Sequence, residues 1–97
     1  MDDELKQLSA VVHGRVQGVF FRKNTTIAAR ELQVSGWVRN LPDGSVEVLA
    51  IGTEGHLKQL LLFLSESPGQ SDVTDIDVNW SSPEDEYRGF TVRYWAG

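Results

Sequence analysis

Residues 35–51 read SGWVRNLPDGSVEVLAI, two strand-like runs separated by a short turn. In the first run, Trp37 and Arg39 fall on one face of an extended chain and Val38 on the other. In the turn, LPDG (41–44), proline presets one φ angle and glycine accepts a positive one. The stretch therefore predicts a β-hairpin.

A segment with helical spacing of its apolar residues lies on each side of this hairpin. Before it, apolar positions begin at Phe21 and recur over about three turns. After it, Thr53 can cap a second helix whose leucines follow an i, i+3, i+4, i+7 pattern. The apolar faces are Phe21, Thr25, Ala28 and Leu32 in the first helix, and Leu57, Leu60, Leu61 and Leu64 in the second. Both segments are predicted to be amphipathic helices.

Three further strand-like runs complete the chain: residues 8–12 (LSAVV), 72–80 (DVTDIDVNW) and 90–94 (FTVRY). Alternation in the second run predicts a half-buried strand. One of its faces would carry Thr74, Ile76, Val78 and Trp80, and the other Val73, Asp75, Asp77 and Asn79.

The resulting order is β-α-β-β-α-β plus a C-terminal strand. With right-handed crossovers, this order predicts an α+β fold, a ferredoxin-like two-layer sandwich with an antiparallel or mixed sheet. Both helices would cover one face of the sheet and leave the other open. No linker divides the chain, so residues 1–97 are predicted to form a single domain, with a core of about 7–94 and short tails. Because this topology hosts enzymes, RNA binders and regulatory domains, it does not decide the function.

The composition is that of a small acidic globular protein. The 97 residues include nine lysines and arginines and fourteen acids, a net charge of −5. This charge argues against nucleic acid or a membrane as a partner, and an anionic substrate would need a local cationic site. There is no cysteine, which excludes disulfides and thiol chemistry. The start, MDDELKQ, lacks a signal-peptide pattern and no apolar run approaches about 18 residues, so a cytoplasmic location is expected.

The stretch GRVQGVFFR (14–22) connects the first predicted strand to the first helix. Backbone N–H groups at such a position often bind anions, and a helix N-terminus adds about half a positive charge. Gly14 and Gly18 would permit a curved backbone, and Arg22 could add a planar fork of donors to the same anion. On these residues alone, a phosphate cradle and an ordinary connection with incidental glycines both stay open.

Asn40 ends the first strand of the hairpin, where an asparagine often only starts a turn. In the predicted fold, however, this strand returns close to the first one, so the Asn40 side chain could face the loop. A neutral amide there can accept from and donate to a water in line with a bound phosphorus. Loop and asparagine together favour a phosphate site.

GRVQGVFFR and, one helix later, GWVRNLPDGSVEV resemble the two signature blocks of the acylphosphatases. The LQVSGW lead-in and the closing FTVRY fit the same pattern, so the resemblance covers roughly residues 7–94. It implies hydrolysis of the carboxyl–phosphate bond of acyl phosphates without metal or cofactor. Inorganic phosphate would be both product and competitive inhibitor, and a monomer is the simplest expectation.

The resemblance also implies the site residues. Arg22 would hold the phosphate and Asn40 would orient the attacking water. The loop backbone that would surround the phosphate comprises Arg15, Val16, Gln17, Gly18, Val19 and Phe20.

Two alternatives come from other classes of protein. An RNA-recognition module with this element order needs aromatic residues on its third strand, and residues 45–51 (SVEVLAI) have none. A regulatory domain would keep only the anion cradle, whereas this chain has both Arg22 and Asn40. His13 and His56 are too far apart in the sequence to suggest metal ligands. The Asp and Glu residues are expected on solvated faces and loops, without the spacing of a metal-binding loop, so no metal site is expected.

Overall fold

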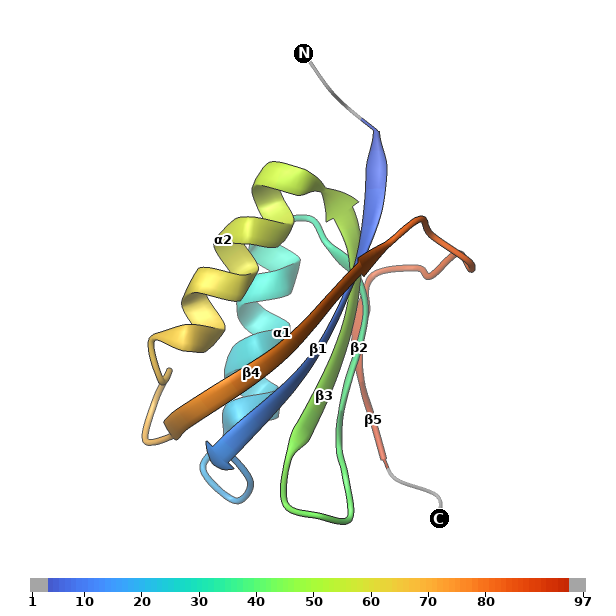
Figure 1. Cartoon of the computed structure of the whole chain (residues 1–97). Coiled ribbons are helices and arrows are strands. Elements are labelled where there is room, and N and C mark those ends of the chain that lie inside the picture. Colours follow the sequence, from blue (N-terminus) through green and yellow to red (C-terminus); the bar gives the residue numbers. More distant parts are fainter. Residues whose placement is uncertain (1–3, 95–97) are drawn as a thin grey trace.

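The computed structural model describes residues 4–94, which form seven elements in the predicted order (Figure 1). These are β1 (Leu5–Arg15), α1 (Phe21–Glu31), β2 (Ser35–Asn40), β3 (Val46–Thr53), α2 (Glu54–Ser65), β4 (Asp72–Ser81) and β5 (Phe90–Arg93). The sheet order is β4-β1-β3-β2-β5, antiparallel except between β2 and β5. With both helices on one face, the ferredoxin-like α+β sandwich is confirmed and its sheet is mixed. The ends of the expected tails, 1–3 and 95–97, lie outside the described residues.

The predicted hairpin is formed by β2 and β3. Their pairing ends at Asn40 opposite Val46, and the backbone N–H of Leu41 donates to the carbonyl of Ser45 at 2.9 Å. Gly44 takes the positive φ that the turn requires, 94°. The hairpin therefore fixes Asn40 at the end of the sheet from which the loop before α1 also emerges.

The core lies between the helices and the inner face of the sheet. Its fully buried apolar side chains include Leu8, Ala10, Val12, Phe21, Val38, Val46, Val48, Leu57, Leu60, Leu64 and Phe90. Burying one such Leu, Val or Phe stabilises the fold by about 1.5–3 kcal/mol. Thr53 caps α2 as predicted, with its hydroxyl oxygen accepting from the N–H of His56 at 3.4 Å.

The buried face of α1 differs from the prediction in its second half. Ala29 is buried where Ala28 and Leu32 were expected. These two residues are only partly buried and line a groove toward α2 with Phe63. The apolar residues of α1 thus pack against both the sheet and α2. The helical spacing of apolar residues alone does not show which of them contact which neighbour.

Strand β4 corrects the predicted alternation. The register between β1 and β4 shifts after His13, which pairs Gly14 with Val73 and leaves Thr74 as an extra residue. As a result Val73 and Ile76 both pack against the core, while Thr74 is exposed. The expectation that Thr74 shares a face with Ile76 is wrong, because a β-bulge adds one residue and reverses the faces beyond it.

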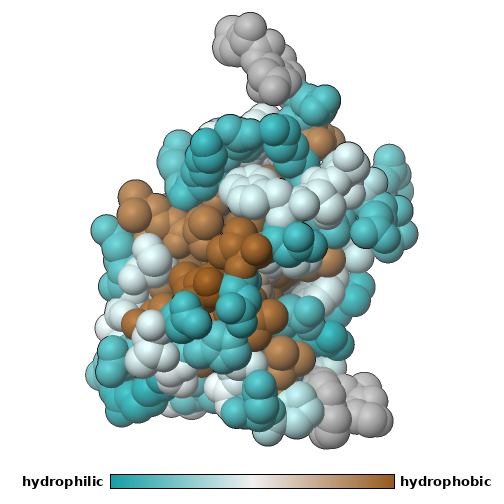
Figure 2. Space-filling view, viewed as in Figure 1, coloured by the Kyte–Doolittle hydropathy of each residue, from teal (hydrophilic) through white to brown (hydrophobic). Residues whose placement is uncertain are grey.

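The core reaches the surface along β4, the edge strand beside α2. Figure 2 shows apolar side chains gathered there, and the hollow between the two elements is lined by Leu61, Leu62, Val73, Ile76 and Val78, among others. Trp80, further along β4, is 38% exposed. The strand is therefore less covered than its alternation predicted.

The C-terminal strand β5 pairs in parallel with β2, with Arg93 opposite Arg39. Phe90 at its start is buried, and the strand also contacts α1. Tyr94, the next residue, is thereby carried to the level of Asn40. This pairing forms one wall of the candidate site.

Candidate active site

The loop before α1 spans residues 16–20 and is shorter than the predicted one, because β1 continues through Arg15. Gly18 has a φ of 73°, and Phe20, just before the helix, is left-handed with a φ of 59°. Phe20 supplies no side-chain cap, and the first turn of α1 contains no acidic residue. The first N–H groups of the helix are thus left to other acceptors, and the positive end of the helix dipole is not neutralised locally.

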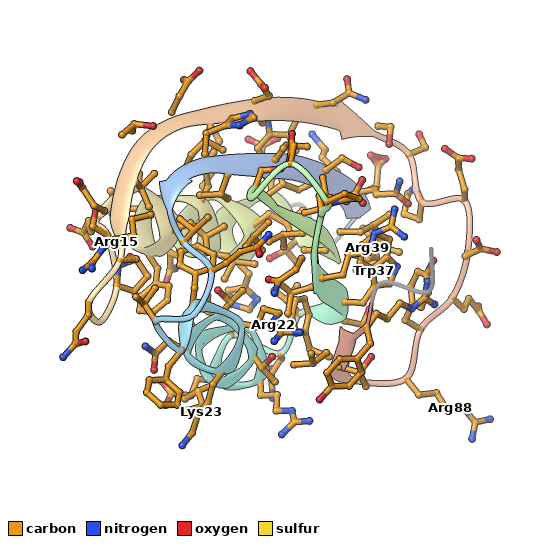
Figure 3. All side chains as sticks on the ribbon, turned by 90° about the horizontal axis from the view of Figure 1, so that it is seen from below. Arg15, Arg22, Lys23, Trp37, Arg39 and Arg88 are labelled. Atoms are coloured by element: carbon orange, nitrogen blue, oxygen red, sulfur yellow. The ribbon has the colours of Figure 1, made fainter. Side chains whose placement is uncertain are left out.

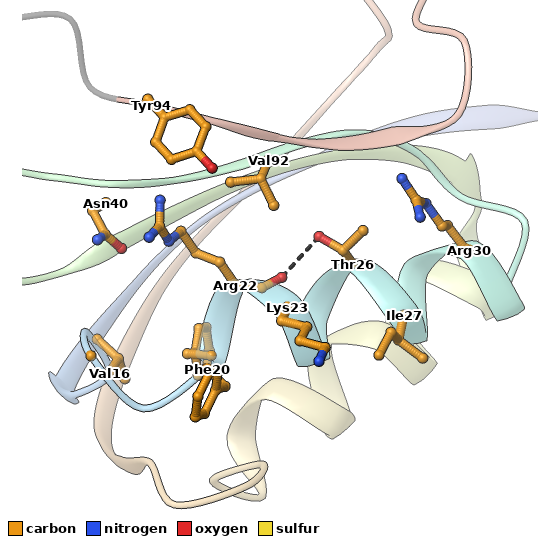
Figure 4. A pocket seen from close by; sticks show the side chains of 12 residues that line it. Val16, Phe20, Arg22, Lys23, Thr26, Ile27, Arg30, Asn40, Val92 and Tyr94 are labelled. Atoms are coloured by element: carbon orange, nitrogen blue, oxygen red, sulfur yellow. Dashed lines mark hydrogen bonds between the residues drawn. The ribbon is translucent and has the colours of Figure 1, made fainter.

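Arg22 projects from the first turn of α1 into a cavity of about 600 Å³ (Figure 4). The cavity is lined by Val16, Gly18, Phe20, Phe21, Arg22, Lys23, Thr26, Ile27, Arg30, Asn40, Val92 and Tyr94. Arg22 is half-buried, and among residues 4–94 no carboxylate lies within ion-pair distance of it. An unpaired guanidinium in a cavity is suited to bind an anion.

Asn40 lies at the end of β2, across from the guanidinium of Arg22 (Figure 4). Its side-chain oxygen Oδ1 is buried and has no hydrogen-bond partner among the described residues. Leaving such an oxygen unsatisfied costs about 1–3 kcal/mol. The structure therefore brings Arg22 and Asn40 together in one cavity, with an acceptor available to a ligand or water.

Gln17 connects the loop to the hairpin. Its side-chain nitrogen Nε2 donates to the backbone oxygens of Leu41 at 2.9 Å and of Ser45 at 2.8 Å. These two residues flank the turn that follows Asn40. The sequence suggested only a backbone role for Gln17, since nothing local to residues 14–22 shows that its amide reaches the hairpin.

Tyr94 is a second residue that the sequence did not single out for the site. The guanidinium carbon of Arg22 lies 5.4 Å from the centre of its ring, within cation–π range. The ring is 77% exposed and so forms an outer wall of the cavity. Pairing of β5 with β2, which the sequence did not reveal, is what places it there.

Two residues of GRVQGVFFR do not face the cavity. Gly14 belongs to β1, where its φ is 118° and an added Cβ would lie 2.1 Å from the carbonyl oxygen of Asp72. A glycine is therefore needed here for the close approach of β1 and β4 at the bulge, and the expectation that Gly14 curves the cradle is wrong. The Arg15 side chain donates to the carbonyl of Gln70 at 2.7 Å, well away from Arg22 (Figure 3). Any contact of Arg15 with a ligand at Arg22 would have to come from its backbone.

The rest of the predicted cradle is the loop of residues 16–20, and three of its residues border the cavity. Val16, Gly18 and Phe20 line the cavity. The side chains of Val16 and Val19 are buried and anchor the loop in the core, which leaves only their backbone groups for binding.

The hairpin turn beside the site is held by Asp43. Its carboxylate accepts from the hydroxyl and from the backbone N–H of Ser45, and these bonds lower the pKa of Asp43 below its usual value. The carboxylate of Asp43 is thus hydrogen-bonded within the turn itself, to Ser45.

Other candidates lie outside the cavity. Nε2 of His13 is 2.9 Å from a carboxylate oxygen of Asp77 on the open face of the sheet. On the same face Trp37 is nearly buried, with the guanidinium groups of Arg39 and Arg93 about 5 Å from its ring. No three His, Asp or Glu side chains within residues 4–94 are arranged to hold a metal ion. Over the same range, no helix has the length and apolarity to cross a membrane.

Comparison with known proteins assigns the chain to a family. The family model for acylphosphatase matches residues 8–92. An acylphosphatase of Salinibacter ruber is 47% identical over 88 residues, 91% of this chain and 93% of its own length. One of Rubrobacter xylanophilus is 43% identical over 90 residues, 93% of this chain and 82% of its own.

Solved structures agree with the sequence relatives. The crystal structure of acylphosphatase from Bacillus subtilis superposes with a TM-score of 0.88 at 37% identity, covering 92% of this chain and 99% of that one. An acylphosphatase from Coxiella burnetii gives a TM-score of 0.86 at 39% identity, covering 93% and 94%. The chain belongs to the acylphosphatase family and is an enzyme that hydrolyses acyl phosphates.

Proposed function

We propose that the phosphoryl group of the substrate binds to Arg22 and to the backbone N–H groups of residues 15–20, while Asn40 orients the attacking water. The observation that carries this assignment is the unpaired guanidinium of Arg22 opposite the buried, unpartnered Oδ1 of Asn40. The uncapped start of α1 supports it, because its N–H groups and dipole favour a dianion.

In this mechanism the oxygen of water bonds to phosphorus as the bond from phosphorus to the carboxyl oxygen breaks. The acyl group leaves as a carboxylate, the phosphate product keeps the hydroxyl, and the remaining proton passes to solvent. A carboxylic acid has a pKa of about 4, so its anion leaves without a general acid. Phosphoryl transfer has a loose transition state that needs mainly positioning and charge stabilisation. Arg22 and the loop supply the charge, and Asn40 supplies the direction of attack.

We further propose that residues 1–97 form one acylphosphatase-like domain, which acts as a cytoplasmic monomer on small acyl phosphates. The reaction would require no metal or cofactor, and the protein would bind neither nucleic acid nor membrane. The net charge of −5 supports the exclusion of nucleic acid and membrane as partners.

The test is hydrolysis of benzoyl phosphate in the presence of EDTA. We expect turnover that EDTA leaves unchanged and that inorganic phosphate inhibits competitively. Phosphate binding without turnover above background would instead favour a regulatory domain, and loss of turnover in EDTA would contradict the metal-independent mechanism.

A further inference from the structure

The cavity extends beyond Arg22 along one face of α1. Arg22, Thr26 and Arg30 follow at intervals of four residues and all line it, opposite Val92 of β5 (Figure 4). At about 1.5 Å per residue, the Cα atoms of the two arginines are about 12 Å apart along the helix. This part of the cavity is therefore an elongated groove that runs from Arg22 to Arg30, and Lys23, beside Arg22 on the same helix, adds a third cation to its lining.

Arg30 is held in place by the sheet but keeps most of its donors. Its Nε donates to the carbonyl of Phe90 at 3.2 Å, which fixes the guanidinium beside β5. A guanidinium has five N–H donors, so this single bond leaves the terminal amino groups available. Within residues 4–94 no carboxylate pairs with Arg30, whereas Arg39 pairs with Glu47 at 2.7 Å. The hydrogen bond that links α1 to β5 thus uses only one of the N–H donors of Arg30.

The middle of the groove is largely apolar. Val92 faces it from β5 and Ile27 contributes a second aliphatic side chain from α1, whereas Val16 lies beyond Arg22, on the Asn40 side. The hydroxyl of Thr26 already donates to the carbonyl of Arg22 at 2.8 Å, which leaves its methyl group for packing. A short aliphatic segment would fit between Arg22 and Arg30, because it has no polar groups that this apolar lining would leave unpaired.

The geometry of the reaction determines how the substrate would lie along the groove. In-line displacement places the attacking water and the leaving carboxylate on opposite sides of phosphorus. Asn40 lies at the Arg22 end of the groove and Arg30 at the other (Figure 4). With the water at Asn40, the acyl group points away from it, toward Arg30.

We propose that Arg30 binds a second anionic group, a carboxylate or a phosphate, at the far end of the acyl chain. The preferred substrates are then acyl phosphates of short aliphatic acids that carry an anion at each end. This inference rests on the proposed function, since it takes the phosphoryl group to be held at Arg22.

The test compares succinyl phosphate with butyryl phosphate, which ends in a methyl group where the former carries a carboxylate. The wild-type enzyme should favour succinyl phosphate in kcat/KM by about tenfold, as expected of a charge-assisted hydrogen bond near solvent. Arg30→Gln should remove that preference through KM and leave butyryl phosphate hydrolysis within about twofold. Arg30→Lys keeps the charge but not the planar fork, and should retain an intermediate preference.

Arg88→Gln is the matched control, because it removes the same charge from an exposed loop residue far from Arg22 (Figure 3). It should leave the preference intact. Equal losses on both substrates in Arg30→Gln, or an equal loss of preference in Arg88→Gln, would overturn the subsite. Failure of the wild-type enzyme to hydrolyse either substrate would overturn the proposed function and the subsite with it.

Discussion

The side-chain amide of Gln17 donates to the carbonyl oxygen of Leu41, the residue that follows Asn40, at 2.9 Å. The same nitrogen donates to Ser45 across the turn at 2.8 Å. One side chain of the loop thus bridges both ends of the turn that holds Asn40. The positions of the loop and of Asn40 are therefore coupled by contacts of the protein itself.

Gln17→Ala should consequently lower turnover more than it lowers phosphate affinity. Losing the two hydrogen bonds should cost about 1–2 kcal/mol of stability. The resulting freedom between loop and turn should lower kcat by about ten- to a hundredfold, since catalysis is sensitive to small displacements. Unfolding in urea, kcat and the inhibition constant of phosphate would be measured together. A stability loss with unchanged kcat would show that the bridge is only structural.

Tyr94→Leu should weaken phosphate binding by removing the ring that lies 5.4 Å from the guanidinium carbon of Arg22. An exposed cation–π contact is worth about 0.5–1 kcal/mol, which corresponds to a two- to fivefold rise in the inhibition constant of phosphate. Tyr94→Phe keeps the ring and is the matched control. Equal effects of the two substitutions would assign the contribution to the hydroxyl instead.

Phe20→Gly should stabilise the fold by up to about 1 kcal/mol, because a left-handed conformation is strained for an L side chain and not for glycine. The ring is 74% exposed at a φ of 59°, so little buried area is lost. The measurement is the free energy of unfolding in urea. A clear loss of stability would mean that the Phe20 ring makes contacts in solution that outweigh the backbone strain.

The lowered pKa of Glu54 predicts how the stability of the fold changes at acid pH. Hydrogen bonds from Lys6 and Lys58, together with their charges, lower the pKa of Glu54 from 4.5 to about 2. Its contribution to stability is therefore complete above about pH 4.5 and is lost as the pH falls toward 2, where the unfolded chain takes up the proton first. The half-exposed carboxylate keeps the effect modest.

Glu54→Gln should lower the melting temperature at pH 7 and flatten its decline between about pH 4.5 and 2. Glu66→Gln, just beyond the other end of α2, serves as the control and should keep the wild-type slope. An unchanged slope in Glu54→Gln would contradict the role of the Lys6–Glu54–Lys58 cluster.

The fold was readable from the sequence because its signals are local. The 41–44 turn, the cap at Thr53 and the leucine spacing of α2 each depend on neighbours within one or two turns. The bulge at Thr74 and the parallel pairing of β5 with β2 depend on approach between distant strands, and no local pattern encodes them.

The same distinction applies to the site. Arg22 and Asn40 could be predicted as site residues because they lie in two specific sequence blocks, and both line one cavity of the structure. The amide of Gln17, the ring of Tyr94 and the groove to Arg30 result from tertiary contacts. The role of Gly14 could not be predicted correctly, because a glycine with a positive φ is suited to a strand bulge as well as to a phosphate cradle.

The central claim is the division of labour between Arg22 and Asn40, and Asn40→Ala measured for both turnover and phosphate affinity tests it most directly. We expect kcat for benzoyl phosphate to fall by about a hundred- to a thousandfold, the loss typical when one well-placed hydrogen-bonding group is removed from an active site. The inhibition constant of phosphate should stay within about threefold of the wild-type value. Arg22→Ala, in contrast, should abolish both. Near-normal turnover in Asn40→Ala, or equal loss of phosphate binding in the two variants, would contradict the account.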